Sequence, residues 1–262
     1  MNTPQIRLFK SFFIVSFSLF ILNSCTSRKE IVYFQDIEAG KEVATTQQYQ
    51  TTLQADDLLI ITVSAVDMEA VRPFNLITAG YSPGSGNITG NPKNQTYLIA
   101  NDGTINFPVI GSLKLGGLTK TDAIQLLKDK LSVYVKDPII NIEMVNFKIS
   151  VLGEVKSPGT YTIPNERITV VEALGLAGDL NIAGKRTNVL VIRDINGAKS
   201  YTRIDLTKKE LFSSPVYYLK QNDVVYIEPN KARIQSADYN PNTGVYLTLA
   251  SILISLVSIL TR

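Results

Sequence analysis

Cys25 has the most specific chemistry of any residue in this sequence, because it is the only cysteine in a chain of 262 residues. A lone cysteine has no partner for a disulfide within the chain. It follows a run rich in Phe, Leu and Ile that extends from Phe12 to Leu22, and a thiol in that position is a good acylation site. We therefore predict a covalent lipid on Cys25, the alternative being an ordinary free or buried thiol.

The first 24 residues are typical of a secretory signal peptide. Arg7 and Lys10 precede the apolar run, and no acidic residue lies among them. The run is about 11 residues long, whereas a helix needs roughly 20 to cross a bilayer core. We expect residues 1–24 to be removed, so that Cys25 becomes the first residue of the mature protein.

The residues that end at Cys25 resemble the lipobox of bacterial lipoproteins. The stretch Leu22-Asn23-Ser24-Cys25 has a leucine three positions upstream and a small residue directly before the cysteine, although Asn23 departs from the usual small or aliphatic residue. Two or three acyl chains on one cysteine anchor a protein stably, because each buried methylene contributes about 0.8 kcal/mol. The following residues lack the aspartate that retains many Gram-negative lipoproteins in the inner membrane, which implies the outer membrane.

Composition argues against enzymes and nucleic-acid binders. The chain has no histidine, and lipidation would leave no free thiol, so the commonest general base, transition-metal ligand and thiol nucleophile are missing. Asp56 and Asp57 are predicted to be turn residues, because neighbours in a strand would point to opposite faces. The net charge of +3 falls to +1 without Arg7 and Lys10. We expect no catalytic residue, cofactor, metal or nucleic-acid partner.

The second group of interest is a stripe of small hydroxyl residues near the C-terminus. From Val245 to Leu260 the sequence has 16 residues without a charge, and a helix of that length spans about 24 Å. The bacterial outer membrane is thinner than average, so residues 245–261 are predicted to form a transmembrane helix, with Tyr246 and Arg262 as interfacial anchors. The hydroxyl residues recur at three- and four-residue spacing on one face, and they are Thr248, Ser251, Ser255 and Ser258.

Two roles suit this stripe, and they are compatible. Small hydroxyl residues can pack helices closely, or they can face water in a pore ringed by identical helices. The alternative is a buried core helix or a simple tail anchor.

The elements before this helix predict an α+β protein with two small mixed α/β domains. Residues 25–50 are polar after a short apolar patch and are predicted to be a lipidated tether. Residues 51–148 should hold a β-rich run at 58–63, a hairpin around Asn101-Asp102-Gly103, a helix capped by Thr119, and an alternating strand at 139–145.

Residues 149–232 are predicted to form a second unit. It should begin with a strand at 150–153 and a Pro-Gly turn. Thr169 and Glu172 form a capping-box pattern that starts a short helix, which should stop at Gly178. A hairpin around Asn196-Gly197 and a strand at 224–227 should complete the unit.

These motifs resemble those of the outer-membrane polysaccharide export lipoproteins of the Wza type. The stretches at 55–63, 101–111 and 117–119 resemble a polysaccharide export domain. Val151-Leu152-Gly153-Glu154-Val155-Lys156-Ser157-Pro158-Gly159 resembles the start of a soluble-ligand-binding β-grasp (SLBB) domain. Larger members carry two such β-grasp domains, whereas this chain has room for one.

The resemblance implies a homo-oligomeric ring whose C-terminal helices form a pore in the outer membrane, with most of the chain in the periplasm. Its cargo would be capsular polysaccharide or exopolysaccharide, and an inner-membrane polysaccharide co-polymerase would be a partner. The alternative is a periplasm-facing glycan-binding or scaffold lipoprotein. A third hypothesis, a carboxylate hydrolase of cell-wall glycan, would require two acids in one cleft, and Asp56 and Asp57 are its best candidates.

Overall fold

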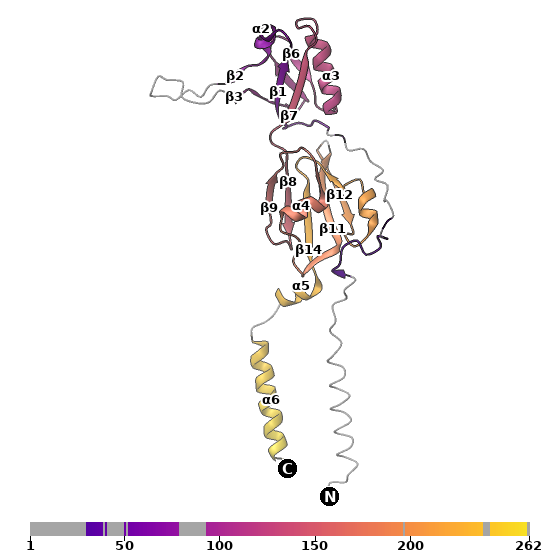
Figure 1. The fold of residues 1–262 in the computed structure, drawn as a ribbon. Helices are drawn as coiled ribbons and strands as arrows, with labels where there is room; N and C mark the ends of the chain where they lie inside the picture. Colours follow the sequence, from indigo (N-terminus) through magenta and orange to yellow (C-terminus); the bar gives the residue numbers. More distant parts are fainter. Residues whose placement is uncertain are drawn as a thin grey trace, which may run out of the picture.

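The computed structural model describes residues 30–38, 40, 50, 52–78, 93–195, 197–237 and 242–260. Two domains follow each other along the long axis of the molecule, and a C-terminal helix stands beyond the second domain (Figure 1). Residues 52–145 form the first domain, and residues 146–230 form the second. The predicted signal peptide and Cys25 lie outside the described residues.

A three-stranded antiparallel sheet forms the centre of the first domain. Its middle strand β1 (Leu58–Ser64) pairs with β4 (Thr96–Leu98) and with β7 (Ile139–Met144). Helix α3 (Lys120–Leu131) lies against β7. The remaining elements are α2 (Met68–Val71), η2 (Arg72–Phe74), β2 (Ile77–Thr78), β3 (Lys93–Asn94), β5 (Thr104–Phe107) and β6 (Gly111–Lys114).

The sequence pattern explains this core. In β7 every second side chain is buried, and these are Ile140, Ile142 and Met144. Helix α3 begins where Thr119 accepts a hydrogen bond from the Asp122 N–H. Its buried face comprises Ala123, Leu127 and Leu131, which recur at four-residue spacing on one side of the helix.

The predicted hairpin around Asn101-Asp102-Gly103 is only partly correct. The turn forms, since the Ala100 N–H donates to the Thr104 carbonyl at 2.9 Å and Gly103 has a φ of +83°. However, β4 pairs with β1, and β5 pairs with β6 in a separate hairpin. The residues of the turn determine the turn itself, but they do not decide which strands pair beyond it.

A five-stranded mixed sheet forms the second domain, with the order β12-β11-β14-β8-β9. Strands β8 (Lys148–Gly153) and β14 (Val224–Pro229) are parallel neighbours at its centre, and the other pairs are antiparallel. Figure 1 shows α4 (Val170–Leu176) lying across this sheet. The remaining elements are β9 (Gly159–Thr162), β10 (Ile168–Thr169), β11 (Gly184–Ile195), β12 (Ala198–Ile204), η3 (Lys209–Ser213) and β13 (Tyr218–Leu219).

Two local features of the second domain follow directly from residue type. The predicted capping box is present, because the Thr169 hydroxyl accepts from the Glu172 N–H and the Glu172 carboxylate accepts from the Thr169 N–H. At the end of β8, Gly153 has a φ of +92°, and a Cβ there would lie 2.0 Å from the Ile227 carbonyl oxygen. Only glycine allows β8 and β14 to approach in this way.

Beyond β14 come α5 (Lys231–Ala237) and α6 (Thr243–Leu260). The mixed α/β class and a C-terminal helix are therefore confirmed. Across the described residues, no helix has both the length and the hydropathy that crossing a membrane requires. The structure thus gives no support to the transmembrane assignment of residues 245–261.

A buried ion pair joins two parts of the second domain. Arg193 in β11 donates to the Asp223 carboxylate from Nη2 at 2.7 Å and from Nε at 3.0 Å. Asp223 is fully buried and Arg193 is nearly so. Arg193 also donates to the Tyr218 carbonyl, and Asp223 accepts from the Lys220 N–H. Each buried charge is therefore compensated by the other.

Removing one member of this pair should destabilise the protein strongly. Arg193→Met leaves the Asp223 charge buried and unpaired, so we expect a loss of about 3–5 kcal/mol in the free energy of unfolding. Urea unfolding followed by circular dichroism measures it. Lys199→Met is the control, because the Lys199–Asp194 pair in the same hairpin is exposed and its loss should have a far smaller effect on stability. Equal losses in the two variants would contradict this account.

Candidate membrane-attachment and assembly surfaces

The predicted hydroxyl stripe lies on α6 as expected, and three of its members bond to their own helix. Thr248 donates to the Gly244 carbonyl, Ser251 to the Thr248 carbonyl, and Ser255 to the Ser251 carbonyl, at 2.8 to 2.9 Å. Such bonds satisfy a hydroxyl without water. This face of α6 is therefore compatible with either an apolar or a wet environment.

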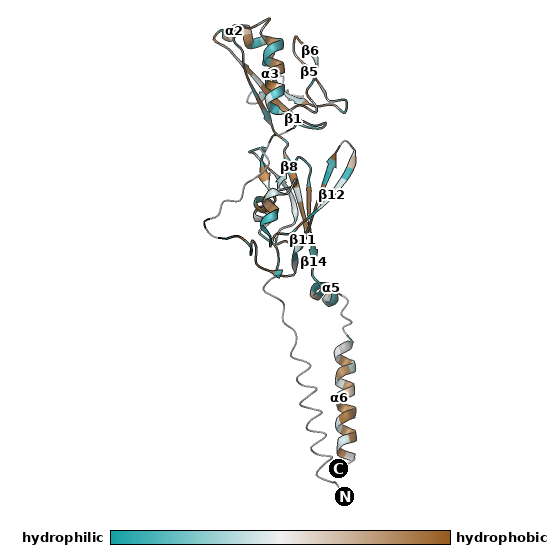
Figure 2. Cartoon of the chain, turned by 90° about the vertical axis from the view of Figure 1, so that its right-hand side faces the viewer, coloured by the Kyte–Doolittle hydropathy of each residue, from teal (hydrophilic) through white to brown (hydrophobic). Residues whose placement is uncertain are grey.

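The rest of α6 is apolar and uncovered. All of its described side chains from Gly244 to Ile259 are exposed. Hydrophobic colour extends along the helix in Figure 2, and α6 stands apart from both domains. An exposed apolar surface of this extent marks a site of contact with a membrane or with protein. The large side chains concerned are Val245, Tyr246, Leu247, Leu249, Ile252, Leu253, Ile254, Leu256, Val257 and Ile259.

Asp56 and Asp57 do not form a carboxylate pair directed into a cleft. Asp56 is exposed in a turn with a φ of +69°, whereas Asp57 is completely buried. One carboxylate oxygen of Asp57 accepts from the Gln54 N–H at 2.7 Å. The other has no hydrogen-bond partner within the described part of the chain. The prediction of turn residues is confirmed, and the arrangement does not suit paired acid/base catalysis.

Glu166 connects the second domain to the first. It lies before β10 with a φ of +53°, and one of its carboxylate oxygens accepts from the Met144 N–H at 2.7 Å. The other accepts from Lys120 Nζ at 2.9 Å, at the start of α3. Because its side chain is only 12 % exposed, this link is screened less than a surface ion pair. The sequence contained no signal for it, since the three residues are far apart in the chain.

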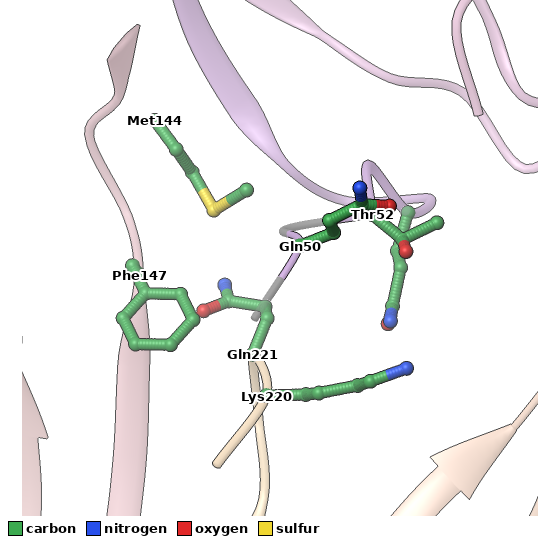
Figure 3. A pocket seen from close by; sticks show the side chains of 7 residues that line it. Gln50, Thr52, Met144, Phe147, Lys220 and Gln221 are labelled. Carbon is green, nitrogen blue, oxygen red and sulfur yellow. The ribbon is translucent and has the colours of Figure 1, made fainter. Parts of the chain in front are cut away.

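A small hollow lies at the same junction (Figure 3). Its volume is about 10 Å³, which is room for at most one water molecule. Gln221 closes one side, where its amide accepts from the Lys148 N–H and donates to the Asn146 carbonyl. This hollow is too small for a sugar residue. Its lining residues are Gln50, Thr52, Gln54, Met144, Phe147, Lys220 and Gln221.

Residues 30–38, which we call the strap, bind to the second domain. The Phe34 N–H donates to the Leu206 carbonyl and the Gln35 N–H to the Thr207 carbonyl, at 3.2 and 2.8 Å. Asp36 accepts from the Lys209 N–H at 2.8 Å. Part of the segment predicted to be a tether is therefore docked on the second domain.

Two aromatic side chains fix the strap in place. The Phe34 ring lies 5.3 Å from the Phe212 ring. The Tyr33 hydroxyl donates to Asp179, and its ring lies 5.8 Å from the guanidinium of Arg186. Burial, together with the nearby Asp179 carboxylate, raises the pKa of Tyr33, so its hydroxyl stays a donor. The apolar patch at 31–34 was the sequence signal for this contact.

Comparisons with known proteins give the chain two adjacent domain matches. Residues 45–145 match the family described as polysaccharide biosynthesis/export protein, and residues 147–227 match the SLBB domain. The two matched segments correspond to the first and second domains of the structure.

Two curated proteins are similar to this chain. The EPS I polysaccharide export outer membrane protein EpsA of Ralstonia solanacearum is 28 % identical over 167 residues, which is 62 % of this chain and 44 % of EpsA. The protein of the same name in Ralstonia nicotianae is 29 % identical over 138 residues, which is 51 % of this chain and 35 % of the relative. The aligned part thus spans less than half the length of either relative.

The buried carboxyl group of Asp57 should make stability depend on pH. Burial raises its pKa to about 6, above the value of about 3.9 in an unfolded chain. The folded state therefore binds the proton more tightly, and the free energy of unfolding should fall by about 2 kcal/mol as pH rises from 4 to 7.

Urea unfolding at pH 4 and pH 7 tests this effect. In Asp57→Asn the carboxyl is replaced by a group that does not titrate, so this part of the decline should disappear. Asp56→Asn, which changes the exposed neighbour, is the matched control and should keep the decline. A decline that persists in Asp57→Asn would contradict the assignment.

Proposed function

We propose a function from the family to which the chain belongs, the Wza-type polysaccharide export proteins. The chain is a non-enzymatic subunit of an oligomeric outer-membrane channel for capsular or extracellular polysaccharide. This proposal rests on the order of the domains along the chain. An export domain is followed by an SLBB domain and then by an uncharged helix with an uncovered apolar surface. Both EpsA relatives are described as polysaccharide export outer membrane proteins.

In this proposal α6 enters the membrane as one of several identical helices. Its 18 residues extend about 27 Å, and packing against neighbouring copies would cover part of its surface. The hydroxyl stripe would face those copies or the water in the passage, because small residues allow helices to approach closely. The apolar side chains on the opposite faces would contact lipid.

The remaining features of the proposal concern attachment and partners. Cys25 would carry the lipid that anchors the mature chain, and both domains would lie in the periplasm. The polysaccharide would be delivered by an inner-membrane co-polymerase. These assignments rest on the sequence motifs and on the family, and no bound metal or cofactor is required for them.

A charge placed in the stripe tests the role of α6. In a ring, Ser255→Asp would place one negative charge per subunit at equivalent positions around the passage, where the like charges repel one another. We expect surface polysaccharide to fall severalfold or to be lost in cells that carry only this variant. Quantification of surface polysaccharide at matched protein levels provides the measurement.

Two controls separate charge from other effects. Ser255→Ala keeps a small side chain in the stripe and should export normally. Ser236→Asp adds the same charge on α5, outside the stripe, and should also export normally. Undiminished surface polysaccharide in Ser255→Asp would count against a pore-lining role.

A second candidate function is a periplasm-facing glycan-binding or scaffold lipoprotein whose α6 docks to a partner protein. The self-satisfied hydroxyls of α6 favour it, because they need neither water nor a ring of copies. A peptide tag placed after Arg262 separates the two functions. The channel predicts that an impermeant reagent labels this tag on intact cells, whereas the scaffold predicts labelling only after the outer membrane is opened.

A further inference from the structure

One face of the five-stranded sheet in the second domain is uncovered. Helix α4 packs against the opposite face (Figure 2), where the paired side chains Val191, Val225 and Val151 are buried. Because side chains alternate between the two faces of a strand, the residues between these point away from α4. They are half-buried or exposed, and no helix of the described residues covers them. A contiguous surface of this kind marks a site of contact.

The strand register places six large side chains together on this face. They form two adjacent rows that run across the strands, because residues paired between neighbouring strands lie side by side. The first row comprises Tyr201, Ile192 and Val224, and the second comprises Leu190, Tyr226 and Leu152. We call these six residues the platform. It crosses β12, β11, β14 and β8, and since neighbouring strands lie about 4.8 Å apart, it is about 14 Å long.

A polar network borders the platform beside Tyr226. The Glu228 carboxylate accepts from Arg203 Nη1 and from Asn188 Nδ2, both at 2.8 Å. Lys185 Nζ donates to the same carboxylate at 3.2 Å. The hydrogen bonds from Arg203 and Lys185 lower the pKa of Glu228, so this carboxylate stays an acceptor at neutral pH. The network therefore offers donors and an acceptor next to an exposed apolar surface.

This combination of groups matches the chemistry of a saccharide. A sugar ring has C–H groups on its faces and hydroxyl groups around its edge. The C–H groups pack on an aromatic ring, whose face carries partial negative charge, and the hydroxyls require donors and acceptors beside it. The platform supplies two tyrosine rings, and polar groups lie at both of its ends. One end has the Glu228 network, and at the other the Ser150 and Thr160 hydroxyls lie 2.9 Å apart.

The other occupant to consider is a second copy of the chain. The centre of a stable protein interface is depleted in charged residues, whereas Arg203 stands in the same row as Leu190 and Tyr226. Arg203 and Glu228 are already paired with each other, so they leave no unbalanced charge for a copy to neutralise. A flat, open strip also admits a polymer, which a closed pocket would not. These observations favour a glycan.

We propose that the platform binds the polysaccharide, with sugar rings stacked on Tyr201 and Tyr226 and their hydroxyls hydrogen-bonded to the Glu228 network. The site lies within the segment that matches the SLBB domain, on the face of the sheet opposite α4. This inference rests on the polysaccharide cargo of the proposed function. It gives the chain a contact with that cargo outside helix α6.

A tryptophan in the platform makes binding observable, because the chain contains none. Full-length Tyr201→Trp in detergent is titrated with short oligosaccharides released by mild acid from the surface polysaccharide of the same cells. Its emission should shift and saturate as sugar rings stack on the indole. Leu176→Trp places the reporter on α4, across the sheet, where Leu176 is also exposed, and its emission should not change. No change at Tyr201→Trp, or equal changes at both positions, would overturn the inference.

Loss of the ring should weaken binding of the same oligosaccharides. Tyr201→Ala should raise their Kd about tenfold in isothermal titration calorimetry. Tyr201→Phe keeps the ring and should bind nearly as tightly as the wild type, and Leu176→Ala is the matched control. Since Tyr201 is 66 % exposed, Tyr201→Ala should keep the wild-type melting temperature. An unchanged Kd in Tyr201→Ala, or a wild-type chain that binds no oligosaccharide, would refute the platform.

Two further measurements separate the occupants and the proposals. If the face joins copies of the chain, Tyr201→Ala should lower the mass of the detergent-extracted particle and leave oligosaccharide binding intact, and that result would also overturn the inference. Normal surface polysaccharide in cells that lack the chain would contradict the proposed function. Calorimetry on the purified chain would still decide whether the platform binds glycan.

Discussion

The uncovered apolar surface of α6 is the constraint on which the organisation of this protein depends. Ten large side chains on this helix are each more than half exposed, and full burial of such a side chain is worth about 1.5–3 kcal/mol. Neither domain covers them in the single chain. A membrane or another protein surface must therefore supply the cover, and the two domains have to be arranged around that requirement.

Specific side-chain contacts link the two domains. Glu166 bonds to both Met144 and Lys120 of the first domain, and Gln221 bonds to the backbone of the short connection between the domains. Within the second domain, the Arg193–Asp223 pair ties β11 to the loop before β14. Since β14 leads into α5, these contacts connect the first domain to the end of the chain that carries α6.

Local features were predictable wherever a single stretch of sequence contains the whole interaction. The caps at Thr119 and Thr169 each join residues three positions apart, and the alternation in β7 is visible without knowledge of its partner. Pairing was less predictable. Strand β4 joins β1 rather than β5, because the ladder is chosen by the burial of side chains across the sheet. The docking of the strap was not predictable, because its hydrogen-bond partners Asp179 and Lys209 lie more than 140 positions away.

Four features of this protein were visible in the sequence alone. They are the lone cysteine after an apolar run, the lack of histidine, the uncharged C-terminal segment with its hydroxyl stripe, and the type of most helices and strands. These are properties of composition and of short spacing. Three other features became visible only in the folded structure. Asp57 is buried beside an exposed Asp56, Glu166 bridges the domains, and the Tyr33 ring lies on Arg186. Each of these depends on groups brought together from distant parts of the chain, and burial and hydrogen bonding there are set by the folded neighbours rather than by adjacent residues.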